Sequence, residues 1–280
     1  MTIRANGLDF AVWSSPPVGG AIPLLLVNGG LLYDHALLWP ALSPLAEKRQ
    51  VILYDQRGRG ASQPPADPQA ARIEDDAADI GAIRRALGIR QWDVLGHSWG
   101  GGIAMLGIAR DLAPVRRLVT VNAVGPSSDW MQALHATALE RAGEADRTTL
   151  TELAGAVGIA DPAIQSRYAR AVYPAWFADA DFASYFVPPE AASETGSAVV
   201  ARLRRDGYDW HGALRALSIP TLVIHGDRDA LPPAVASQLQ AVLPKATVRL
   251  IANAGHMPFW EAPRRFFEVV DHFLVTGRIL

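Results

Sequence analysis

The stretch that decides the fold is residues 92–109, WDVLGHSWGGGIAMLGIA. It opens with a short apolar run typical of a buried strand and continues into a segment that favours a helix. Between the two lies the pattern G-x-S-x-G, with Ser98 at its centre. A sharp strand-to-helix turn exposes the serine hydroxyl, and the amide N–H groups of the following helix favour negative charge beside it. We therefore predict that Ser98 is a nucleophile rather than part of an ordinary tight turn.

Outward from this stretch, short apolar runs alternate with longer segments of helical period. The further runs that predict strands are 24–27, 51–54, 118–121, 221–225 and 248–251. The segments that predict helices are 35–46, which Pro40 and Pro44 break, 73–87, one from about 233, and 264–273. Strands that are apolar throughout and alternate with helices indicate a parallel sheet covered on both faces.

The chain between residues 125 and 212 breaks this rhythm. It contains helical stretches and no convincing parallel-strand run; the stretches are 131–142, 149–157, 163–172 and 198–205. We predict a core made of residues 1–124 and 213–280, with residues 125–212 inserted between two strands of the sheet as a helical cap. The fold class is therefore α/β.

Composition excludes several classes of protein. The chain has 280 residues, of which 50% are hydrophobic and 19% charged, as expected of a folded chain with a large core. The net charge of −2 gives no general attraction to nucleic acid or to an anionic membrane, and no apolar run reaches the roughly 18 residues of a membrane span. The absence of cysteine excludes disulfides and a thiol nucleophile.

The sequence says less about cellular location and oligomeric state. The first residues, MTIRANGLDF, lack a basic segment followed by an apolar one, so no signal peptide is expected and the expected location is cytoplasmic. Nothing in the sequence indicates an oligomeric state.

A serine nucleophile needs a general base, and His256 fits that role best. It follows the apolar run 248–251, and ligands meet an open parallel sheet at the loops after its strands. The other histidines lie inside the nucleophile turn, at a strand end or on expected helices. We therefore predict that His256 is the base.

The base in turn needs an acid that orients it. Two carboxylates, Asp227 and Asp229, follow the strand at 221–225, and the chain order serine, acid, histidine suits either of them. One of the two is expected to act in the turn instead. The residues by themselves leave both alternatives open.

Two backbone N–H groups are expected to stabilise an oxyanion. One belongs to Trp99, directly after the nucleophile, and the other to Gly30, in the Asn28-Gly29-Gly30 loop after the first buried run. Glycines let the backbone approach a substrate closely, although a plain tight turn is the alternative explanation.

Taken in order, three motifs resemble those of the α/β-hydrolase superfamily: GHSWGG at 96–101, HGDRD at 225–229 and NAGHMPFWEAP at 253–263. The resemblance extends over essentially the whole chain and includes YDQRGRGAS at 54–62, a segment with a structural role in that family. It implies an eight-stranded, mostly parallel sheet and a Ser-His-Asp triad, and its G-x-x-D spacing selects Asp229 as the acid.

Within the superfamily, the motifs look most like those of the proline iminopeptidase group. That resemblance implies a serine hydrolase that forms an acyl-enzyme intermediate and releases N-terminal residues from peptides, without a metal or organic cofactor. Esterases, lactonases and natural-product hydrolases share the same motifs, so a small hydrophobic metabolite is the alternative substrate. A non-catalytic small-molecule binder is a second alternative.

Aromatic and acidic residues near the site are candidates for binding the small-molecule or short-peptide substrate. Aromatic side chains of the cap are expected to line an apolar pocket, and carboxylates are expected to bind an amine. The candidates are Trp176, Phe177, Tyr185, Glu190, Glu194 and Glu261.

Overall fold

A computed structural model describes residues 1–187 and 193–280 and has an eight-stranded sheet at its centre. The sheet order is β1-β2-β4-β3-β5-β6-β7-β8. The strands are β1 Thr2–Ala5, β2 Leu8–Ser14, β3 Leu24–Val27, β4 Val51–Tyr54, β5 Trp92–His97, β6 Val115–Val121, β7 Thr221–Gly226 and β8 Ala246–Ile251. Only β1 with β2 and β2 with β4 pair antiparallel. The predicted mostly parallel sheet is confirmed.

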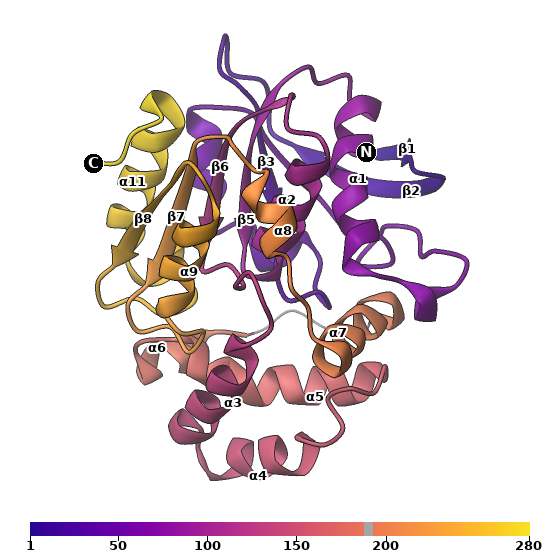
Figure 1. The fold of residues 1–280 in the computed structure, drawn as a ribbon, viewed down its shortest axis with the longest axis vertical. Helices are drawn as coiled ribbons and strands as arrows, with labels where there is room; N and C mark the ends of the chain where they lie inside the picture. Colours follow the sequence, from indigo (N-terminus) through magenta and orange to yellow (C-terminus); the bar gives the residue numbers. More distant parts are fainter. Residues whose placement is uncertain (188–192) are drawn as a thin grey trace.

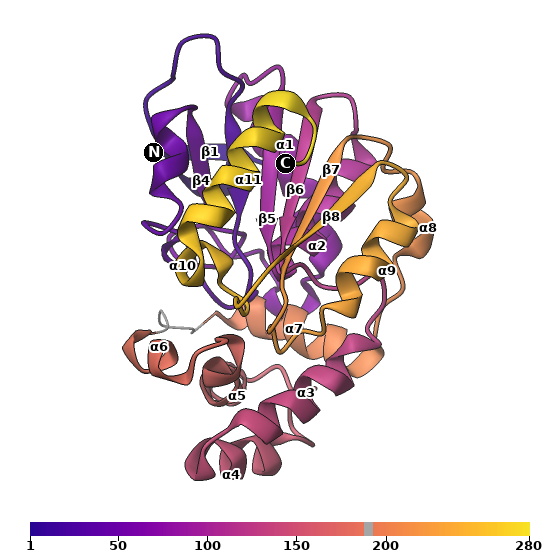
Figure 2. The ribbon, with the colours of Figure 1, turned by 90° about the vertical axis from the view of Figure 1, so that its left-hand side faces the viewer.

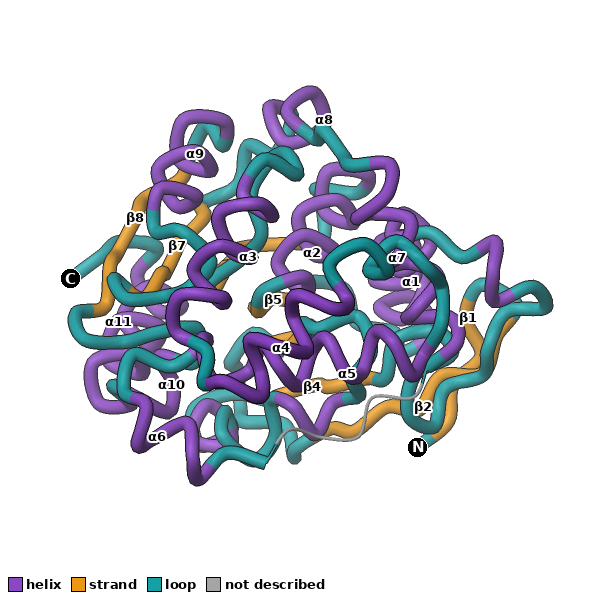
Figure 3. Tube along the Cα trace, turned by 90° about the horizontal axis from the view of Figure 1, so that it is seen from below, coloured by secondary structure: helices purple, strands orange, loops and turns teal. Residues whose placement is uncertain are grey.

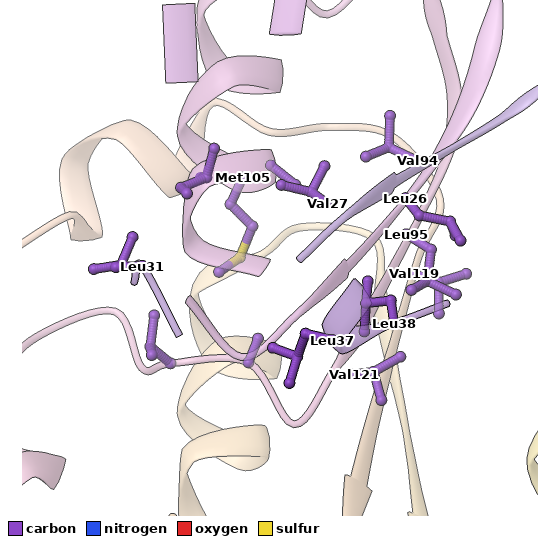
Figure 4. Packing of buried hydrophobic residues seen from close by; sticks show 14 of the residues in the cluster. Leu26, Val27, Leu31, Leu37, Leu38, Val94, Leu95, Met105, Val119 and Val121 are labelled. Atoms are coloured by element: carbon purple, nitrogen blue, oxygen red, sulfur yellow. The ribbon is translucent and has the colours of Figure 1, made fainter. Parts of the chain in front are cut away.

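The central strands are buried on both faces, which is why they are apolar throughout. Leu26 of β3 pairs in register with Leu95 of β5, which pairs with Val119 of β6. These three side chains gather on one side of the sheet, while Val27 lies on the other with Met105 (Figure 4). Parallel strands in this register end at one edge, so the loops that follow them meet there.

Helices cover both faces of the sheet, as predicted. On one face lie α1 Ile73–Ala86, α2 Trp99–Arg110, α8 His211–Arg215 and α9 Ala234–Val242, and on the other lies α11 Pro263–Thr276 (Figures 1 and 2). The short helix α10 Pro258–Glu261 precedes α11. Ion pairs from Lys48 and Arg49 to Asp271 attach α11 to the segment before β4.

Five helices follow β6 and lie beyond the strand ends, where Figures 1 and 2 show them below the sheet. They are α3 Trp130–Arg141, α4 Glu144–Leu153, α5 Pro162–Val172, α6 Ala180–Tyr185 and α7 Glu194–Asp206. We call them the cap helices; Figure 3 shows them from below. The boundaries of the two units, at residues 125 and 212, stay a prediction. In the described part of the chain, no helix combines the length and the apolar character that crossing a membrane requires.

The sequence-based assignment missed β1, β2, α6 and α8, and three predicted helices differ from those observed. The helix expected over 198–205 begins at Glu194. The segment 35–46 is interrupted, as its two prolines predict, but its helical parts are short 3-10 turns, His35–Leu37 and Ser43–Glu47. Pro40 and Pro44 lack the backbone N–H donors that a continuous α-helix needs. The cap helix expected over 149–157 is Glu144–Leu153. Acidic residues in its first turn, which favour a helix start, were overlooked.

Candidate active site

Ser98 occupies a strained turn between β5 and α2. Its φ of 53° is rare for a residue other than glycine. The turn packs so tightly that a Cβ on Gly96 would lie 2.5 Å from the Gly100 carbonyl oxygen, and one on Gly100 would lie 2.1 Å from the Val27 carbonyl oxygen. The two glycines of the motif therefore allow β3, β5 and α2 to approach one another around Ser98.

His256 and Asp229 form a buried pair at the ends of β8 and β7. The His256 Nδ1 lies 2.8 Å from the Asp229 Oδ2. The same carboxylate accepts hydrogen bonds from the Asn122 side chain, at 2.6 Å, and from the Leu231 N–H, at 3.0 Å. With the carboxylate ionised, Nδ1 carries the imidazole proton and Nε2 is left as the basic nitrogen.

The carboxylate stays ionised because its partners outweigh its burial. Burial by itself raises the pKa of Asp229, but the nearby His256, and hydrogen bonds from His256 and Asn122, bring that pKa below its ordinary value. A second imidazole, that of His225, has its Nε2 3.4 Å from the same carboxylate. The competing Asp227 is exposed. Of the two acids that the residues left open, the structure therefore places Asp229 against the imidazole.

A cavity of about 290 Å³ lies between the strand ends and the cap helices. Ser98 and His256 both line it, as do Gly30 and Trp99, the two expected oxyanion donors. No hydrogen bond to the Ser98 hydroxyl is formed within residues 1–187 and 193–280. Hydrogen bonds of this kind are often loose without substrate and tighten when it binds.

The loop that carries Gly30 is pressed against the nucleophile turn. A Cβ on Gly29 would lie 2.7 Å from the Cβ of Ser98, and Gly30 adopts a φ of +80°. The Asn28 side chain donates to the Tyr33 carbonyl and holds the loop closed. The backbone of Gly29 and Gly30 therefore lies directly beside Ser98, where a larger residue would not fit.

His97, next to the nucleophile, is held in one neutral form. Its ring nitrogen Nε2 donates to the carbonyl oxygen of His256 at 2.9 Å. Burial, with a smaller contribution from His256, lowers the pKa of His97 to about 3. His97 therefore stays uncharged at neutral pH and supports the loop that carries His256.

Trp176 connects the cap to the histidine. Its ring stacks on the His256 ring with centroids 4.0 Å apart, and its carbonyl oxygen accepts the His256 N–H at 2.6 Å. A Cβ on Gly255 would lie 2.1 Å from that same oxygen. Trp176 lines the cavity, as expected, and also holds His256 in place.

Glu261 was expected to face the substrate, but in the structure its carboxylate binds two backbone N–H groups. Oε1 accepts the Ala178 N–H at 2.6 Å and Oε2 accepts the Gly255 N–H at 2.8 Å. Burial raises the pKa of Glu261, although these N–H groups oppose that effect. The carboxylate joins the cap to the histidine loop and does not line the cavity.

The remaining cap candidates also lie elsewhere. Phe177 is buried among the aromatic rings of Tyr173, Phe182 and Phe186, outside the cavity wall. Tyr185 is 85% exposed. Glu194 begins α7 and accepts a hydrogen bond from the Gln69 side chain. Glu190 lies outside the described residues. Helical spacing could not separate a ring that faces the cavity from one that packs inside the cap.

Sequence reasoning missed Arg204 and Gln165, two members of a polar group at the cap end of the cavity. The group consists of Arg204 on α7 with Gln165 and Tyr168 on α5. The sequence held no signal for Arg204, because its place beside Val200 on the cavity face of α7 follows from how α7 packs and not from the local sequence. Asn122, which binds Asp229, was also missed.

A possible metal-binding group lies apart from the cavity. Asp34, His35 and Asp55 bring ligand atoms close together. Asp55 already accepts hydrogen bonds from the backbone of His35 and Ala61, and the His35 ring nitrogen lies 2.8 Å from the Asp55 carboxylate. This bonding among protein groups accounts for the cluster without a metal.

Comparisons with known proteins agree with the geometry. A family model for the alpha/beta hydrolase fold matches residues 22–263. The chain is 28% identical to a proline iminopeptidase of Lactobacillus delbrueckii subsp. lactis, with 99% of each chain covered. It is 32% identical to a 2-hydroxymuconate semialdehyde hydrolase of Pseudomonas putida, with 94% of this chain and 90% of the relative covered. The crystal structure of VinJ superimposes with a TM-score of 0.77 at 23% identity, covering 99% and 98% of the two chains.

Proposed function

The chain belongs to the α/β-hydrolase family, and we propose that it is a serine hydrolase in which Ser98, His256 and Asp229 form the catalytic triad. One observation supports this most strongly. The strained serine and an imidazole bound to a buried carboxylate line the same cavity, although the serine and the histidine are 158 positions apart in the sequence (256 minus 98).

In the proposed reaction, His256 Nε2 takes the proton of the Ser98 hydroxyl as Oγ attacks the substrate carbonyl carbon. The oxygen of the tetrahedral intermediate is bound by the N–H groups of Trp99 and Gly30. The imidazolium then protonates the leaving group, which departs and leaves an acyl-enzyme. Water, deprotonated by His256, then attacks the acyl carbon and forms a second tetrahedral intermediate. When this intermediate collapses, the bond to Ser98 Oγ breaks, Oγ takes the proton back from His256, and the acid is released.

The cavity wall supports a small, largely apolar acyl substrate. Most of the residues that line it are aliphatic or aromatic, and none of its described residues is Asp or Glu. The free amine of a peptide would need a negative partner when removed from water. We therefore favour hydrolysis of an ester, a lactone or a carbon–carbon bond in a small metabolite. Similarity to a proline iminopeptidase supports N-terminal peptide cleavage as the second candidate.

A substrate panel tests the choice between these candidates. We expect 4-nitrophenyl acyl esters to be hydrolysed at a higher kcat/KM than proline 4-nitroanilide, because the described cavity offers a free amine no carboxylate. N-acetylproline 4-nitroanilide is the matched control. Rapid cleavage of the free-amine anilide, lost on acetylation, would contradict the ester assignment and support the peptidase.

A further inference from the structure

Arg204 is a cation in the cavity wall without an acidic partner. Its Nη1 donates to the Gln165 Oε1 at 2.8 Å, and its guanidinium lies 4.4 Å from the centre of the Tyr168 ring. Within residues 1–187 and 193–280, it forms no ion pair, and its Nε and Nη2 have no hydrogen-bond partner. The residue is half-buried and lines the cavity, so these N–H groups stay available to a ligand of opposite charge.

The guanidinium is held in one orientation. Gln165 is fixed because its Nε2 donates to the carbonyl oxygens of Val157 and Ile159, both at 2.8 Å, which directs Oε1 toward Arg204. Tyr168 is fixed in turn by a hydrogen bond of 2.9 Å between its hydroxyl and the His135 ring. A cation positioned in advance in this way binds an anion with little further loss of entropy.

The unused edge of Arg204 matches a carboxylate. In this same chain, Arg57 uses Nε and Nη2 to bind both oxygens of Asp79, at 2.8 and 2.6 Å. Arg205 binds Asp206 with the same pair of atoms, at 2.8 and 3.1 Å. On Arg204, Nε and Nη2 are the donors that have no hydrogen-bond partner among the described residues. A carboxylate is planar and has two acceptor oxygens, so it fits this pair of donors.

We propose that Arg204 binds a carboxylate of the substrate at the cap end of the cavity, while Ser98 attacks a carbonyl at the other end. This rests on the proposed function and narrows it. The substrate class is a small, mostly apolar molecule with a hydrolysable carbonyl and, separated from it by the length of the cavity, a carboxylate.

Paired esters test this proposal. The 4-nitrophenyl monoesters of straight-chain dicarboxylic acids from C4 to C8 are compared with the neutral 4-nitrophenyl esters of the same chain lengths. We expect the wild-type protein to prefer the charged ester at one or more lengths. In Arg204→Met, which keeps the length of the side chain and removes its charge, kcat/KM for that ester should fall about 10- to 100-fold, the usual effect of losing a charge-assisted hydrogen bond.

Three comparisons make the result specific. The neutral esters should lose much less kcat/KM than the charged esters in Arg204→Met, and the melting temperature reports that the variant is folded. Arg205→Met, on the next residue of the same helix and exposed, should leave both series unchanged. Arg204→Lys should keep part of the preference, because it retains the charge but not the two-donor edge.

The outcomes separate this proposal from the proposed function. If Ser98-dependent hydrolysis of neutral esters is present but no charged ester is preferred, or if Arg204→Met lowers both series equally, the carboxylate proposal is wrong and the hydrolase remains. If no ester is hydrolysed, the function fails, and calorimetric titration with C4 to C8 monocarboxylates decides the role of Arg204. Binding that disappears in Arg204→Met supports that role, and absence of binding to the wild type contradicts it.

Discussion

Ser98→Ala is expected to lose about 10³-fold or more of kcat on the best substrate of the panel, because none of the other described residues that line the cavity is Ser, Thr or Cys. The change removes one oxygen atom from a cavity wall and keeps the Cβ. The fold and the melting temperature should therefore be close to those of the wild type. Initial rates, together with circular dichroism, measure both quantities.

A matched serine provides the control for this prediction. Ser197 on α7 is also buried, does not line the cavity, and its hydroxyl has no hydrogen-bond partner in the described structure. Ser197→Ala should retain wild-type rates. Turnover by Ser98→Ala at the wild-type rate would remove the serine from the mechanism.

The nucleophile could be predicted because its requirements are local. The G-x-S-x-G pattern is carried by five consecutive residues, and the apolar runs on either side predict the strand and the helix that the turn connects. The parallel sheet was predictable for a similar reason, since burial on both faces makes each central strand apolar throughout.

Asp229→Asn is expected to lower kcat about 10³- to 10⁴-fold, as loss of the triad carboxylate does. An amide has no charge to stabilise the imidazolium. Its nitrogen would also face Nδ1 of His256 and favour the tautomer with the proton on Nε2, which cannot accept the serine proton. The effect should appear in kcat with little change in melting temperature beyond that of a single buried substitution.

Asp227→Asn is the control for Asp229→Asn. It makes the same chemical change two residues away, at an exposed position without contact to His256. Its rates should match those of the wild type. Equal losses in the two variants, or a larger loss in Asp227→Asn, would show that the acid has been assigned to the wrong residue.

The acid illustrates where local reasoning ends. Asp227 and Asp229 follow the same strand and have the same chemistry, so the residues alone could not separate them. The structure separates them through distant groups: Asn122 after β6 and His256 after β8 both contact Asp229. Contacts between loops that are far apart in the sequence depend on how the strands are ordered in the sheet.

The cap shows the same limit more strongly. Trp176 and Phe177 are neighbours of similar character, yet one stacks on His256 and the other packs among cap rings. Glu261 was expected to bind the amine of a substrate because its carboxylate is close to His256 in the sequence. In the structure, that carboxylate instead accepts hydrogen bonds from the backbone N–H groups of Ala178 and Gly255. Arg204 resembles the basic residues common at the end of a helix, and only the packing of α5 against α7 places it in the cavity wall.

Covalent labelling with a fluorophosphonate tests most directly whether Ser98 is a nucleophile activated by His256 and Asp229. The labelled protein is analysed by intact-mass and peptide mass spectrometry. We predict a single adduct on the peptide that contains Ser98, absent from Ser98→Ala and formed much more slowly in Asp229→Asn. No adduct on the folded wild-type protein, or an adduct that persists in Ser98→Ala, would contradict it.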